Sequence, residues 1–210
     1  MRFLVIGCAV LATLGGCATV SMAPASQMII SASVTEGQSE FRQTCSDFSE
    51  NVYARDLITK RNGVSQVFNM LAFGESIETA DTAYRERVQI DTAPASVVYK
   101  TIEADAAWAT RNLDQITGQV SGLLENAKSK DATSSLRKDL VAFEEVLVLS
   151  KRVRLSLIDA MDQLDGQASE ERAEAEIAIA DYEASIDKAA KYIERLSDAH
   201  AKVDNNQATS

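Results

Sequence analysis

The chain has 210 residues, and its 31 acidic side chains exceed its 21 lysines and arginines to give a formal net charge of -10. With only 2 prolines and 9 glycines, it has too few turn formers for a β-sandwich, barrel or propeller, so long helices are expected. The acidic balance disfavours nucleic-acid binding, and a single histidine with 3 cysteines excludes most metal and nucleophile sites.

The N-terminus has the layout of a secretory signal peptide. Met1 and Arg2 supply a positive charge, and Phe3 to Leu14 form an apolar run that is shorter than the roughly 20 residues needed to span a bilayer. The following stretch Leu14-Gly15-Gly16-Cys17 resembles the lipobox of bacterial lipoproteins. In these proteins the cysteine is joined to diacylglycerol, the peptide that precedes the cysteine is removed, and the new N-terminus is acylated.

This resemblance implies that residues 1–16 are a cleaved signal peptide and that Cys17 is lipidated. Because one acyl chain gives marginal membrane binding and two or more anchor stably, the lipid alone would hold the protein on a membrane. In such lipoproteins an aspartate after the cysteine favours inner-membrane retention. Ala18 stands there instead, which implies the periplasmic side of the outer membrane. The alternatives are an uncleaved anchor or an ordinary signal peptide cut after Ala23 or Ala25.

The same interpretation gives each of the three cysteines a role. Cys8 leaves with the signal peptide and Cys17 carries lipid, so Cys45 is the only free thiol of the mature chain. It lies between Phe41 and Phe48 on one helical stripe, which predicts a buried structural thiol. An intermolecular disulfide is the alternative.

Residues 17–33 are small and polar without a period, which predicts a lipidated N-terminus followed by a flexible tether. A first helix is expected from about residue 35 to 61, and a second from about 64 to 90 with Gly74 inside it. Residues 205–210 are predicted to form a polar tail.

Three longer helices are expected in the second half of the chain, at about 94–127, 136–165 and 169–204. Pro94 fits the first turn of the helix at 94–127, and Ser169 caps the helix at 169–204. Gly118 and Gly122 have the spacing of a close helix approach, with a dimer face as the alternative. The apolar stripes of the three helices contain, in chain order, Val98, Ile102, Ala109, Leu113, Ile116, Val120 and Leu123, then Leu136, Leu140, Phe143, Leu147, Leu157, Met161 and Leu164, then Ile179, Tyr182, Ile186, Ala189, Ile193, Leu196 and Val203.

These patterns predict an all-α fold over residues 34–204. Short loops between long helices favour an up-and-down antiparallel bundle of four to five helices, the last three long. A parallel dimeric coiled coil is the competing arrangement.

The chemistry of most enzyme classes is missing from the sequence. It contains no pair of Glu-x-x-His motifs for a di-iron site, and no phosphate-binding, nucleophile-elbow or CxxC motif. We therefore expect a non-catalytic protein without metal or cofactor, acting as a structural or protein-interaction module of the cell envelope. The alternative is a lipoprotein that binds an apolar small molecule or lipid between its helices, lined by Tyr84, Trp108, Phe143 and Tyr182.

A candidate partner surface lies in the second predicted helix. Residues 67–73 are apolar on more sides than one stripe requires, which suggests an exposed contact made by Phe68, Met70, Leu71 and Phe73. A hairpin element packed against the longer helices is the alternative. The expected partners are thus the membrane, through the lipid on Cys17, and an envelope protein, but no nucleic acid.

Overall fold

A computed structural model describes residues 25–59, 82–126, 133–164 and 169–208, and the regular secondary structure in these ranges is α-helical throughout. The all-α prediction is confirmed. The helices are α1 (Ala25–Ala54), α3 (Thr82–Arg87), α4 (Ala95–Asn126), α5 (Thr133–Gln163) and α6 (Glu170–Ala208).

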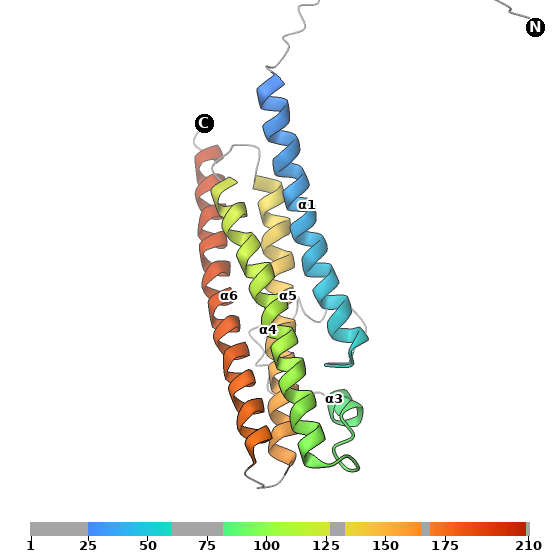
Figure 1. Ribbon diagram of the computed structural model, residues 1–210. Coiled ribbons are helices and arrows are strands. Elements are labelled where there is room, and N and C mark those ends of the chain that lie inside the picture. Colours follow the sequence, from blue (N-terminus) through green and yellow to red (C-terminus); the bar gives the residue numbers. More distant parts are fainter. Residues whose placement is uncertain (1–24, 60–81, 127–132, 165–168, 209–210) are drawn as a thin grey trace, which may run out of the picture.

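The four long helices alternate in direction along the chain (Figure 1): α1 and α5 run one way, and α4 and α6 run the other. Helices α4, α5 and α6 all contact one another, and the parallel pair α4 and α6 is the most extensively packed. Helix α1 packs on α5 and α4, at the side of the molecule away from α6. The fold is therefore a three-helix core with α1 laid against its α4–α5 side.

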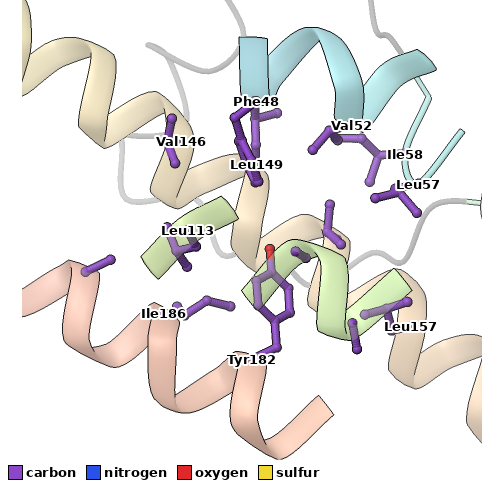
Figure 2. Close-up of a cluster of buried hydrophobic side chains, with 14 of the residues drawn as sticks. Phe48, Val52, Leu57, Ile58, Leu113, Val146, Leu149, Leu157, Tyr182 and Ile186 are labelled. Atoms are coloured by element: carbon purple, nitrogen blue, oxygen red, sulfur yellow. The ribbon is translucent and has the colours of Figure 1, made fainter. Parts of the chain in front are cut away.

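The hydrophobic core follows the predicted stripes. Figure 2 shows side chains of α1, α4, α5 and α6 turned toward one another, with Tyr182 of α6 pointing into the interior. Every stripe residue predicted on α4 is buried, and those on α5 and α6 that the structure describes are buried or partly buried. The fully enclosed positions include Leu113, Ile116, Phe143, Leu149, Leu157, Tyr182 and Leu196, each with 0% exposed area.

Helix α1 begins earlier, and helix α6 ends later, than the sequence predicts. Helix α1 begins at Ala25, inside the segment expected to be a tether, because no glycine or proline interrupts the chain between Pro24 and Gly37 and serine is only mildly unfavourable in a helix. Helix α6 continues to Ala208, through most of the predicted polar tail.

Helices α1 and α3 both end in a Schellman motif built on a residue other than glycine. Asp56 has φ 50°, and the amide of Leu57 donates to the carbonyl of Val52 at 3.1 Å. Leu57 and Val52 are both fully buried, which is the apolar contact that accompanies this cap. Helix α1 therefore stops before the predicted end near residue 61.

Gln89 repeats this geometry after α3, with φ 54° and a bond from the amide of Ile90 to the carbonyl of Arg85 at 3.3 Å. The left-handed conformation costs a residue with a side chain about 1–2 kcal/mol, and glycine adopts it freely. We expect Gln89→Gly to raise the free energy of unfolding by about 0.5–1 kcal/mol in urea titrations, after the greater entropy of the unfolded glycine is subtracted. Gln89→Ala is the matched control and should bring no gain, since alanine keeps the Cβ atom; a gain of equal size would contradict the explanation.

The predicted starts of α4 and α6 are confirmed. The carbonyl of Pro94 accepts from the amides of Val97 at 2.9 Å and Val98 at 3.2 Å, at the entrance to α4. At α6, the hydroxyl of Ser169 accepts from the amide of Arg172 at 3.2 Å, which is an N-cap bond.

The expected close helix approach at Gly118 and Gly122 is wrong. Both glycines are exposed, and a Cβ atom added at either would meet nothing within 4 Å. Their register turns them away from the α4 stripe that contacts the other helices.

Candidate functional site

The densest polar cluster of the described residues surrounds Asp105, which is 3% exposed on α4. The hydroxyl of Tyr84 donates to its Oδ2 at 2.9 Å. The guanidinium of Arg87 spans both carboxylate oxygens, donating to Oδ2 and, at 3.1 Å, to Oδ1. Arg55 adds an ion pair at 3.8 Å from its Nη1 to Oδ1.

Three elements bring these residues together. Asp105 shares the register of the α4 stripe, three residues after Ile102 and four before Ala109. Tyr84 and Arg87 are three residues apart on α3 and therefore lie on one face of that helix. Arg55 lies in the capped turn that ends α1.

Trp108, one turn along α4 from Asp105, extends the cluster. Its ring stacks on Phe48 of α1 with centroids 5.8 Å apart and an interplanar angle of 3°. The guanidinium of Arg55 lies 4.5 Å from the centre of the Trp108 ring, a cation–π distance. The tryptophan is partly buried and packs against the core.

This arrangement is suited to holding the chain together. The donors from Tyr84 and Arg87 occupy both carboxylate oxygens, so Asp105 has little capacity left to accept a hydrogen bond from a ligand. Burial, together with the negative charge of Asp105, raises the pKa of Tyr84, so that its hydroxyl stays a donor. Asp105 thereby connects Arg55, which precedes residues 60–81, with Tyr84 and Arg87, which follow them.

Helix α3 also has polar contacts with α5. The guanidinium of Arg85 donates to the side-chain oxygen of Gln163 and lies 3.6 Å from Asp159. Gln163 donates in turn to Asp159 at 2.9 Å. A helix of 6 residues is too short to be stable alone, so these contacts and the Asp105 cluster position it.

A second buried carboxylate, Asp139 on α5, faces α1. Its side chain has 0% exposed area, and Arg42 Nε lies 3.3 Å from its Oδ1. Neither carboxylate oxygen has a hydrogen bond. Burial raises the pKa of Asp139 to about 6, against the opposing charge of Arg42.

Cys45 is buried at 2% exposure on the α1 stripe, which confirms the predicted location of this thiol. Burial raises its pKa to about 12, and the negative charges of Asp139 and Glu145 act in the same direction. A thiol with so high a pKa is a poor nucleophile near neutral pH.

The other predicted site residues have separate outcomes. Cys17 and the candidate partner residues Phe68, Met70, Leu71 and Phe73 lie outside the described residues. Of the four aromatic residues proposed to line a ligand site, three have specific contacts: Tyr84 bonds to Asp105, Trp108 stacks on Phe48, and the Phe143 ring packs edge-on against Phe41 at 6.0 Å. Tyr182 is fully buried, and its hydroxyl has no hydrogen-bond partner among the described residues.

No metal centre emerges from the side chains that the structure describes, because no three histidine, cysteine, aspartate or glutamate residues gather there as ligands would. Among the same residues, no helix has both the length and the apolar content to cross a bilayer.

Neither buried carboxylate was among the site residues expected from the sequence. Asp139 follows Leu136 by three residues and precedes Phe143 by four, on the α5 stripe itself. The same check of register would have found Asp105. Its partners, however, come from α3 and the end of α1, and no local pattern connects those segments to α4.

Comparison with known proteins gives no relative: no family model, curated protein or solved structure matches the chain.

Proposed function

We propose that the protein is a lipid-anchored, non-catalytic helical bundle of the bacterial cell envelope that acts as a structural or protein-interaction module. The observation that carries this proposal is the N-terminal sequence, in which a positive charge, a short apolar run and Leu14-Gly15-Gly16-Cys17 follow in order. Cys17 would carry the lipid, and the bundle would lie on the periplasmic side of the outer membrane.

The fold supports a division between anchor and bundle. The described helices bury their apolar stripes against one another and enclose aromatic residues such as Tyr84, Tyr99 and Phe143 almost completely. Such a core needs no lipid to cover it. The membrane attachment can therefore reside in the N-terminal cysteine alone.

Cys17→Ser tests the anchor. We expect the wild-type protein, extracted from membranes, to have a mature N-terminus at Cys17 with the mass of a diacylglyceryl group and a further acyl chain. Cys17→Ser should lack the added mass and leave the membrane fraction. Intact-mass measurement with N-terminal peptide mapping reads both outcomes.

Cys8→Ser is the matched control, because it changes a cysteine within the segment expected to be removed. It should leave the lipidated mass unchanged. An unmodified mature N-terminus at another residue, or lipidation that survives Cys17→Ser, would refute the anchor.

We further propose that Phe68, Met70, Leu71 and Phe73 contact an envelope protein. Support comes from their apolar sequence and from the Asp105 cluster, which fixes the chain on both sides of residues 60–81 against α4.

A photoreactive amino acid at Phe68 or Leu71 should cross-link one discrete partner in intact cells. The same group at Ile177, a side chain 63% exposed on α6, is the control. Equal cross-linking from Ile177, or none from residues 68 and 71, would argue against this surface.

A further inference from the structure

The contact between α1 and α5 contains a carboxyl group whose burial is poorly compensated. Asp139 lies between two fully enclosed α5 residues, Leu136 and Phe143, and has no exposed side-chain area. Its Oδ1 is 3.3 Å from Arg42 Nε, but no hydrogen bond reaches either oxygen. A buried carboxylate usually requires several such bonds, because an ion pair alone does not repay the lost hydration.

Helix α1 is the element that can relieve this cost. It covers the α4–α5 side of the core, and among the described long helices it has extensive contacts with α4 and α5 but not with α6. The polar contacts of α1 with α4 and α5 include the Arg42–Asp139 ion pair and a weak bond, 3.4 Å, that the side-chain amide of Gln119 on α4 donates to Thr44. Detachment of α1 would return the carboxyl group of Asp139 to water.

The groups around Asp139 set the sign of the effect. On α1, Arg42 favours the carboxylate and Cys45 is a neutral thiol. On α4, Gln119, whose side-chain amide donates to Thr44 of α1, carries no charge. On α5, the negative charge of Glu145 raises the pKa of Cys45. Among the described residues, Arg42 of α1 is the charged group that lowers the pKa of Asp139. Burial outweighs Arg42, so the attached state favours the protonated carboxyl.

We propose that the seam between α1 and α5 is a pH-sensitive contact, in which protonation of Asp139 tightens the attachment of α1 to the three-helix core and ionisation loosens it.

The linkage sign follows from the direction of the pKa change. The pKa of Asp139 is about 6 when α1 is attached and returns toward 3.8 when the carboxyl is hydrated. The attached state therefore binds more protons between these values, and its stability falls as the pH rises through this window. Between pH 5 and pH 7.5, the equilibrium constant for α1 opening should increase about tenfold.

Amide hydrogen exchange of the intact protein at pH 5 and pH 7.5, corrected for intrinsic exchange rates, measures this opening. We expect the protection of α1 amides to fall about tenfold relative to α6 amides at the higher pH. Trp108, the only tryptophan, stacks on Phe48 of α1, so its fluorescence should change over the same range. A uniform change across all helices, or none in α1, would overturn the proposal even if every variant failed to fold.

Asp139→Asn should abolish the relative change in α1 and increase its protection at pH 7.5. Asp162→Asn, an exposed position on the same helix, should behave as the wild type. Glu144 needs its own control, because burial raises its pKa as well. Glu144→Gln should retain most of the effect. If Glu144→Gln removes it and Asp139→Asn does not, the assignment to Asp139 is wrong.

Discussion

Leu149→Asp should unfold the bundle. Leu149 has 0% exposed area on α5, and Figure 2 shows it within the cluster that α1, α4, α5 and α6 form together. Aspartate there loses the leucine packing and places a carboxylate within a cluster of buried apolar side chains. We expect a loss of about 4 kcal/mol or more, comparable with the whole stability of a marginal domain. Circular dichroism melts would record lost cooperativity or a largely unfolded chain at 25 °C.

Ile177→Asp is the matched control for this substitution. Ile177 is 63% exposed on α6, so the same change should alter stability by no more than about 0.5 kcal/mol. Leu147→Asp should fall between the two, because Leu147 is only partly buried at the edge of the core. A folded Leu149→Asp variant, or equal losses at Leu149 and Ile177, would show that the core lies elsewhere.

Asp105→Ala should have the second-largest effect. It leaves the hydroxyl of Tyr84 and the guanidinium of Arg87 without the carboxylate that joins them. The Arg87 side chain is 27% exposed, so its charge can be partly rehydrated, whereas the hydroxyl of Tyr84 stays buried without its acceptor. We expect a loss of about 2–3 kcal/mol, the range for losing a buried hydrogen bond to a charged group. Urea denaturation should show this loss, and limited proteolysis should show faster cleavage near α3, whose attachment depends on the cluster.

Asp114→Ala is the control on the same helix. Asp114 pairs with Lys188 at 3.1 Å, but the side chains of both are about half exposed, at 42% and 54%. Exposed pairs contribute about 1 kcal/mol or less, so the loss should be small. If Asp105→Ala cost no more than Asp114→Ala, the cluster would not be what holds α3 to the core.

The sequence predicted the helices well where a stripe was long and regular. Residues such as Ile102, Leu113 and Ile116 recur at helical spacing, and all are buried. Periodicity specifies which face of a helix is buried, and that face survives errors of several residues at the ends.

The ends were harder to predict because they depend on local backbone geometry. Helix α1 stops where Asp56 takes a positive φ, a conformation for which glycine or asparagine is the usual signal. Position 56 is an aspartate instead, and the nearest glycine that follows α1, in Asn62-Gly63, lies further along the chain. The polar clusters failed for a different reason: Arg55, Tyr84 and Asp105 are far apart in the chain, and only the packed fold brings them into contact.

The proposed function joins a self-contained helical bundle to the membrane through one lipidated cysteine. A chain beginning at Ala25 tests it most directly, because it keeps all of α1 and removes Cys17. Circular dichroism and sedimentation of this chain in buffer without detergent should show a highly helical monomer with one cooperative melting transition. An aggregate, or a chain with little helix, would show that the bundle requires the membrane or a partner to fold and would contradict the account.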